Sequence, residues 1–246
     1  IYMTVTLHVE KLNGDILGPE DVVFLERNGI HSLFSSCDVR MNDEIVSSMT
    51  AYPYTSTLSR YLGCSMGIRE SVWTDLDGSW VNLLGKSDLV GVDESQFMSQ
   101  IAKIAKSRSI TLYGRVYSDV LTSCRQYLPP GVSLGIDLRR SPDAFALNSV
   151  KTVDGYRINI ETASLYLQRL RLKPSLLPSV LSSITSQASL VFNRFETKMM
   201  AIPKGAKVWR WLDFLFSAPL PNRVYFSFVA QDSLYGNINK SSTHFE

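Results

Sequence analysis

The regular alternation of apolar and polar side chains at the start of the chain constrains the fold more than any other feature. Ile1, Met3, Val5, Leu7 and Val9 take the odd positions, whereas the even positions carry Tyr, Thr, Thr, His and Glu. Successive side chains of a β-strand point to opposite faces of a sheet, so this period of two predicts a half-buried strand.

The same alternation recurs in residues 32–42 and 131–140. The expected inward residues are Leu33, Cys37, Val39 and Met41 in the first stretch and Val132, Leu134, Ile136 and Leu138 in the second, with Ser36, Asp38, Arg40 and Asn42 outward. Further β runs are expected at about 110–121, 190–202 and 223–230. Many short strands of this kind indicate an all-β architecture.

A tight hairpin is expected between residues 145 and 162. Asp154 and Gly155 form a pair that supplies the positive φ of a primed turn, and the flanks are rich in β-branched and aromatic residues. The apolar phase of the second strand runs through even positions at 156–160, shifts to odd ones at 165–167 and returns at 170–172. Such a shift predicts bulges or a strand that turns a sheet corner.

Helical periodicity is confined to connections. Residues 94–106 place apolar side chains on one stripe, with Asp93 available as an N-cap, and residues 54–62 and 175–187 are weaker candidates. The prediction is therefore an all-β fold with a few short helices in loops, and a jelly-roll β-sandwich fits this pattern better than a βαβ fold.

Composition removes several functional classes. The chain has 246 residues and 45% hydrophobic content, which is ample for a core, and its net charge is only +2, which argues against a strong nucleic-acid footprint. Cys37, Cys64 and Cys124 lack CxxC spacing and are interpreted as reduced thiols. No stretch approaches the roughly 20 apolar residues that cross a bilayer.

Catalytic and metal-binding motifs are weak. Residues 63–67 match G-x-S-x-G around Ser65, but the flanking pattern is not strand-turn-helix, so a glycine-rich turn is the preferred interpretation. His8, His31 and His244 share no ligand spacing and are interpreted as ordinary surface or capping histidines. Residues 75–78 resemble only the start of a calcium loop and are expected to be a turn. We expect no catalytic site, no metal and no cofactor.

Other candidate residues are structural. Turns are expected at Asp154, Gly155, Pro203, Gly205 and Pro221. On a strand, Arg169 and Arg171 would point the same way and form a small positive stripe toward phosphates or an acidic neighbour, although a solvated face is the simpler interpretation. Trp209 and Trp211, together with Arg169 and Arg171, are candidate subunit contacts.

Six stretches, taken in order, resemble the hexon-like double jelly-roll major capsid proteins of Polinton (Maverick) elements and adintoviruses, which are related in architecture to adenovirus hexon. The stretches are IHSLFSSCDVRMND (30–43), AYPYTSTLSRYLG (51–63), LYGRVYSDVLTSCRQYLPPGVSLGIDLRRSPDAFAL (112–147), YRINIETASLYLQRLRLKPS (156–175), AIPKG (201–205) and LPNRVYFSFVAQDSLYGN (220–237). Residues 64–109 do not share the resemblance. Each stretch alone is an ordinary strand-and-turn phrase, so their order carries the resemblance.

The resemblance implies two domains. Residues 1–187 would form the first jelly roll, with one or more N-terminal strands missing, and residues 188–246 would begin a truncated second one. The strand at 223–230 would then lack its partners, which would lie beyond Glu246. Its side chains Phe226 and Phe228 would be exposed on an unpaired edge, which is a hazard for aggregation.

The resemblance also implies a structural, non-enzymatic function. The chain would be a major capsid subunit that trimerises into pseudo-hexagonal capsomers of an icosahedral DNA-virus or Polinton-like shell. Its partners would be itself as a homotrimer, neighbouring capsomers, and penton and minor capsid proteins, with no specific nucleic-acid site and no transmembrane segment. It would be found in the virion, after assembly in the host nucleus or cytoplasm.

Two other hypotheses about the function remain open. A β-sandwich binding module, such as a lectin-like or virion attachment protein, would require a cluster of aromatic and carboxylate side chains at one loop end. An enzyme would depend on Ser65 as a nucleophile, and labelling by a serine-reactive phosphonate would distinguish that reading.

Overall fold

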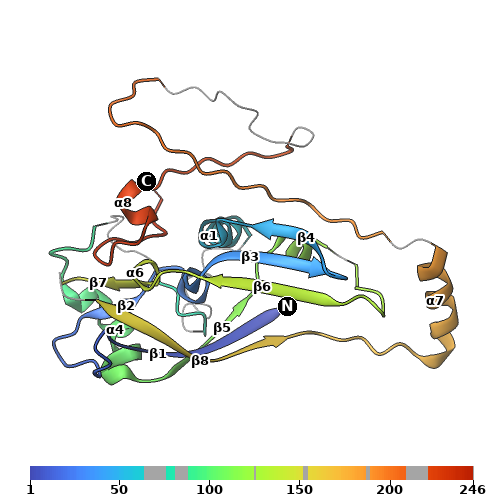
Figure 1. The fold of residues 1–246 in the computed structure, drawn as a ribbon, viewed down its shortest axis with the longest axis horizontal. Helices are drawn as coiled ribbons and strands as arrows, with labels where there is room; N and C mark the ends of the chain where they lie inside the picture. The colour runs from blue at the N-terminus through green and yellow to red at the C-terminus, as the bar shows by residue number, and fades with distance from the viewer. Residues whose placement is uncertain are drawn as a thin grey trace.

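The computed structural model describes residues 1–63, 76–80, 88–124, 126–151, 155–186, 189–208 and 221–245 (Figure 1). It contains 26% helix and 27% strand. The strands are β1 (Tyr2–Lys11), β2 (Val23–Leu25), β3 (Phe34–Met41), β4 (Glu44–Met49), β5 (Ile110–Arg115), β6 (Leu134–Arg140), β7 (Leu147–Ser149) and β8 (Tyr156–Tyr166). The α-helices are α1 (Tyr52–Gly63), α4 (Met98–Ile104), α5 (Asp119–Ser123), α6 (Asp143–Ala146), α7 (Leu177–Ser186) and α8 (Gln231–Leu234), and short 3-10 turns occupy Gly29–Leu33, Glu94–Phe97, Ala105–Ser107 and Pro174–Leu176.

The strands form small antiparallel sheets. Their orders are β5-β1-β8, β4-β3-β6 and β2-β7. Small antiparallel sheets agree with the alternation in the sequence, but the helical share is nearly as large as the strand share, so the fold is mixed rather than all-β with a few short helices. Short helices at connections such as Asp119–Ser123 and Asp143–Ala146 account for part of this difference.

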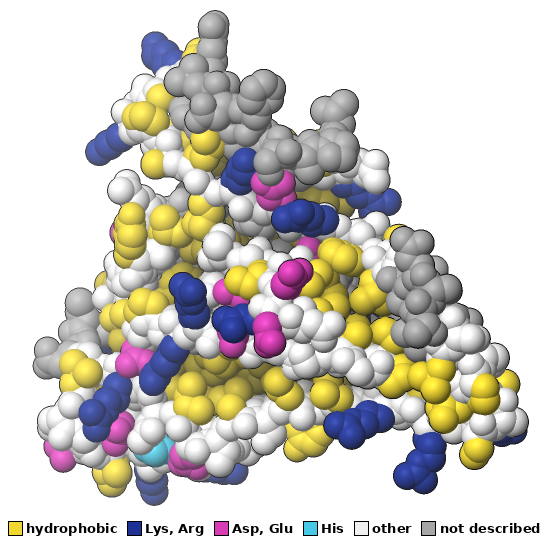
Figure 2. Space-filling view, turned by 45° about the vertical axis from the view of Figure 1, so that its right-hand side comes forward, with side chains coloured by type: hydrophobic (Ala, Val, Ile, Leu, Met, Phe, Trp, Pro, Cys, Tyr) yellow, Lys and Arg dark blue, Asp and Glu magenta, His cyan; other side chains and the backbone are white. Residues whose placement is uncertain are grey.

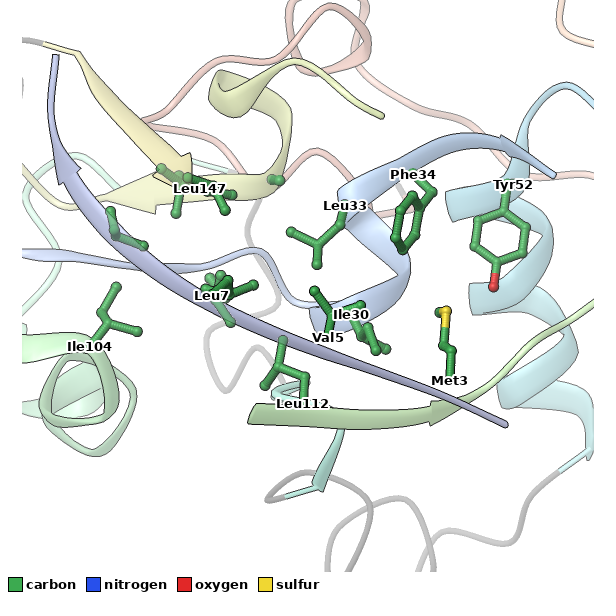
Figure 3. Close-up of a cluster of buried hydrophobic side chains, with 14 of the residues drawn as sticks. Met3, Val5, Leu7, Ile30, Leu33, Phe34, Tyr52, Ile104, Leu112 and Leu147 are labelled. Carbon is green, nitrogen blue, oxygen red and sulfur yellow. The ribbon is translucent and has the colours of Figure 1, made fainter. Parts of the chain in front are cut away.

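The core lies between the β5-β1-β8 sheet and the β4-β3-β6 sheet (Figure 1, Figure 3). Met3, Val5, Leu7 and Val9 of β1 are at most 2% exposed, so the alternation predicted for this strand is confirmed. Their neighbours in the buried cluster include Cys37 and Val39 from β3, Leu112 from β5, Tyr52 from α1 and Leu147 from β7. Strand β1 therefore supplies one continuous apolar row to the core while it pairs with a strand on each side.

The phase shift predicted in the strand after Gly155 is confirmed as a bulge in β8. Thr6 of β1 pairs with Thr162, whereas the next residue, Leu7, pairs with Ile160. The extra residue is Glu161, which is exposed and binds His8 Nδ1 at 2.7 Å. A bulge bends the strand and moves the following side chains to the other face, which is what the sequence pattern indicated.

The hairpin predicted across residues 145–162 is wrong. Strand β7 pairs with β2 and strand β8 pairs with β1, so the two segments lie in different sheets. A tight hairpin instead joins β3 to β4, where Asn42 and Asp43 adopt φ values of 49° and 69°. Positive φ at both central residues is the requirement of a type I′ turn, and Asn and Asp are the non-glycine residues that meet it most readily.

Three other strand predictions are corrected. The run predicted at 110–121 ends at Arg115 and continues into α5, and the described residues of 190–202 and 223–230 belong to no strand. Ser36, expected to face outward, is buried beside a register shift between β3 and β6. The helices were better predicted: α1 and α7 lie where expected, and the Asp93 side chain accepts a hydrogen bond from Ser95 N at 2.9 Å.

His31 is a buried core residue and not the surface or capping residue that was expected. It is 1% exposed, its Nδ1 lies 3.0 Å from the Tyr52 hydroxyl, and its ring meets Tyr117 edge-on. Burial, assisted by the nearby Arg60 charge, lowers the pKa of His31 from 6.5 to about 3. The folded protein therefore holds this imidazole neutral under conditions in which the unfolded chain would protonate it.

This difference predicts acid sensitivity. Because the folded pKa is depressed, the unfolded state binds the extra proton below about pH 6.5, and stability should fall as the pH drops from 6.5 toward about 3. The contribution of His31 is up to about 1.4 kcal/mol per pH unit. Urea unfolding at a series of pH values should show this slope in wild type and in His8→Gln, and His31→Phe should lose it. An unchanged slope in His31→Phe would contradict the assignment.

Candidate functional site

The most distinctive feature of the molecule is a long segment that lies outside the core. We call residues 167–230 the arm, and residues 1–166 with 231–245 the body. In Figure 1 the arm leaves the end of β8, reaches α7 at the far right, returns above the β4-β3-β6 sheet and rejoins the body at α8. Within the described part of the chain, no arm residue is buried.

Large apolar side chains are exposed along the whole described arm. They are Leu167, Leu170, Leu172, Leu176, Leu177, Leu181, Val191, Phe195, Met199, Met200, Ile202, Val208, Val224, Tyr225, Phe226 and Phe228. Phe226 is 72% exposed and Phe228 59%. Monomeric soluble proteins rarely expose apolar surface on this scale, and such surface marks an interaction site. Phe226 and Phe228 are thus exposed as expected, but on a segment that forms no strand and not on an unpaired strand edge.

Charge is divided between the arm and the body. The arm carries nine Lys and Arg residues against two acidic ones, a net charge of +7. The rest of the chain carries sixteen Lys and Arg residues against twenty-one acidic ones, a net charge of −5. The net charge of +2 for the whole chain conceals this division, and counting by segment would have found it in the sequence. The arm is thus both apolar and basic.

The arm is attached to the body by a few polar contacts near its middle. Asn193 N donates to Ser123 Oγ at 2.9 Å, and Thr197 Oγ1 lies 2.9 Å from Thr55 Oγ1. Beside them is a polar cavity of about 190 Å³, lined by residues 48–50, Asp119 and 194–197. The buried Asp119 carboxylate accepts hydrogen bonds from Ser118 Oγ and Val120 N of the body. It also lies 3.5 Å from Phe195 N of the arm, so it contacts both parts.

The segment that follows the arm is anchored to the body by Glu26, a fully buried carboxylate directly after the end of β2. It accepts hydrogen bonds from Ser241 Oγ (2.7 Å), Ser242 N (3.1 Å), and Thr243 N and Oγ1 (3.1 and 2.6 Å). Asn148 Nδ2 also donates to it. Ser241, Ser242 and Thr243 are 0% exposed. Burial of a carboxylate is tolerated when every oxygen is hydrogen-bonded, as here.

Residues 237–240 extend this anchor. Ser149 N of β7 donates to Ile238 O at 2.6 Å, and Asn239 Nδ2 donates to the carbonyls of Ser149 and Lys151. The body therefore includes residues 231–245, which the resemblance had assigned to the start of a second jelly roll. The domain boundary at 187/188 itself stays a prediction.

The predicted candidate residues are distributed as follows. Arg169 and Arg171 are exposed on the arm. Pro203 and Gly205 form a turn in which Ala206 N donates to Pro203 O at 3.2 Å and Gly205 has a φ of 82°. Pro221 is exposed before a bend, and the Gly155 carbonyl accepts from Leu12 N at 3.1 Å. Asp154, Trp209, Trp211 and Ser65 lie outside the described residues.

Chemistry-bearing side chains are not brought together in the described residues. Within them, no group of three or more His, Cys, Asp or Glu residues could hold a metal ion. Asp77, from the stretch that resembles a calcium loop, forms an ion pair with Arg60 at 3.0 Å. Cys37 is fully buried, and burial raises the pKa of its thiol to about 12, which keeps it protonated and unreactive.

No protein-family model, no curated protein and no solved structure matches this chain. None of the helices in the described ranges has the length and apolar character of a bilayer-spanning helix.

The Glu26 anchor predicts a large effect of mutation. Glu26→Gln places an amide NH₂ against donors, and Glu26→Ala leaves buried donors without an acceptor. Each orphaned buried donor costs about 1–3 kcal/mol, so both variants should lose roughly 3 kcal/mol or more of unfolding free energy. Denaturant unfolding measures the loss, and limited proteolysis should find residues 231–245 released first. Glu20→Gln, at a 93% exposed side chain, is the matched control, and equal stability of Glu26→Gln and the control would contradict the anchor.

Proposed function

We propose that the protein is a structural subunit of an assembled shell and has no catalytic role. The observation that carries the proposal is the arm, whose described residues expose large apolar side chains from Leu167 to Phe228 while the body has its own closed core. Exposure of this extent is costly in water and is relieved when another polypeptide covers it. A chain built in this way is suited to assembly.

The particular shell follows from the resemblance of the six ordered stretches. We propose a major capsid subunit of the hexon-like double jelly-roll type, with the jelly-roll sandwich as its finer fold. Three subunits would form a pseudo-hexagonal capsomer that tiles an icosahedral DNA-virus or Polinton-like shell, in contact with neighbouring capsomers and with penton and minor capsid proteins. Small antiparallel sheets packed across a shared core support this proposal without requiring it.

The physical demands on such a subunit agree with the division into body and arm. A capsomer needs a rigid unit that keeps its shape and an adaptable surface that contacts neighbours. The body supplies buried strands, and the arm supplies an exposed surface that is fixed at both ends. A binding module would instead concentrate aromatic and carboxylate side chains at one loop end.

The proposal predicts that the chain self-associates through the arm. Native mass spectrometry and negative-stain imaging of the chain should find trimers with a pseudo-hexagonal outline. Phe226→Ser/Phe228→Ser should weaken the assembly by roughly tenfold or more, because two exposed aromatic anchors are removed from the contact. Folding of the body should not change, as circular dichroism would show.

The matched control removes two exposed apolar residues from the body. Ile16 and Val90 are 71% and 54% exposed, and Ile16→Ser/Val90→Ser should assemble like wild type. A well-folded wild-type monomer at all concentrations would refute the structural role and would favour the binding module.

A further inference from the structure

Residues 167–173, the first part of the arm, restrict the kind of partner that could bind there. Residues 167–173 continue the line of β8 past the last pair with β1, Tyr2 and Tyr166, and belong to no strand in the described structure. Leu167, Leu170 and Leu172 are 49%, 53% and 37% exposed, and Arg169, Arg171 and Lys173 are exposed between and beside them. The segment therefore needs backbone partners, apolar contacts and negative charge together.

These requirements exclude two common partners of basic apolar segments. A bilayer offers no hydrogen bonds to an extended backbone, so a segment outside a helix or closed sheet does not enter it. Duplex nucleic acid would neutralise the arginines but would leave the leucines exposed to water. A protein with a free sheet edge and acidic side chains meets all three requirements, because strand addition supplies main-chain hydrogen bonds and pockets for alternate side chains.

The β3–β4 hairpin of this same chain has the matching properties. Among the described strands, β4 pairs with β3 alone, so its other edge carries no strand from that part of the chain. At its start Asp43, Glu44 and Ile45 are all exposed, Ile45 to 58%. Among the described residues, neither Asp43 nor Glu44 forms an ion pair. The β4 edge can pair with the backbone of residues 167–173, and Ile45 can contact their leucines. The carboxylates of Asp43 and Glu44 can pair with their arginines.

We propose that residues 167–173 of one copy dock along the β4 edge of a second copy, with Arg169 and Arg171 facing Asp43 and Glu44. The net charges of +7 on the arm and −5 on the rest of the chain favour this contact between arm and body and disfavour contact between two arms. Figure 2, which brings the right-hand side of Figure 1 forward, shows basic, acidic and apolar side chains interspersed on that face.

The contact joins two different surfaces and is therefore heterologous. Each copy gives one arm and receives another, so the arrangement closes when the rotation between copies completes a ring. The inference rests on the proposed function, since a threefold capsomer is one such ring, and it adds which surfaces meet within it.

Charge reversal tests the contact. Arg169→Glu/Arg171→Glu and, separately, Asp43→Asn/Glu44→Lys should each raise the dissociation constant of self-association about tenfold or more, because like charges then oppose each other. Asn tolerates the positive φ of position 43. The chain that combines all four changes should recover association to near the wild-type level. The control Lys204→Glu reverses an exposed arm charge outside the proposed contact and should have a smaller effect. Sedimentation equilibrium at low and high salt provides the measurement, and the wild-type contact should weaken with salt.

Mixing the two reversed chains distinguishes contact between copies from contact within one copy. Each variant alone opposes like charges, but every arm in the mixture finds an oppositely charged hairpin on the other variant. Association should therefore return in the mixture as assemblies that contain both chains, as native mass spectrometry would show, and a ring of three satisfies two of its three contacts in this way.

Four outcomes would overturn the inference. Wild-type-like trimers of both charge variants would overturn the contact and leave the proposed function in place. Rescue by the combined chain without association in the mixture would place the contact within one copy. A wild-type monomer that floats with vesicles of anionic phospholipid, or that binds duplex DNA, would assign the arm to those partners. A wild-type monomer that binds neither would overturn both proposals.

Discussion

The Glu26 carboxylate is the interaction on which the division of this molecule depends. It is fully buried directly after β2 and receives donors from Asn148 and from residues 241–243. Residues 241–243 lie more than two hundred positions away in the sequence. The arm is therefore held at its start by the pairing of β8 with β1 and after its end by the Glu26 anchor. It is a closed loop, which limits the entropy lost when a partner orders it.

The body and the arm differ in how far their apolar side chains are buried. In the body, the odd residues of β1 face those of β3 across one core, and even His31 and Cys37 are buried there in their neutral forms. In the arm, no described residue is buried. The body buries its apolar side chains within one chain, whereas the arm can bury its own only against another polypeptide. The division of charge indicates that the basic arm binds an acidic surface such as that of the body.

Local signals predicted local features well. The period of two identified β1, and Asp93 identified the start of the helical stretch that includes α4. The shift in apolar phase indicated bulges or a sheet corner after Gly155, and the structure has a register shift at Glu161. The prediction of a hairpin at Asp154 and Gly155 was wrong for a reason that is not local. A turn sequence indicates only that the chain can reverse its direction there. Strand β7 pairs with β2 and strand β8 pairs with β1, and both partners lie far away in the sequence.

The sequence by itself determined which residues alternate, where the bulge and caps lie, and that Phe226 and Phe228 would face water if their segment had no partner. Periodicity carries this information because side-chain direction follows directly from local backbone geometry. Only the tertiary structure decided that Asn42 and Asp43 form the tight hairpin, that His31 is buried, and that Glu26 holds residues 241–243. These features depend on contacts between distant segments, and a buried polar group reveals its partners only when the chain has brought them together.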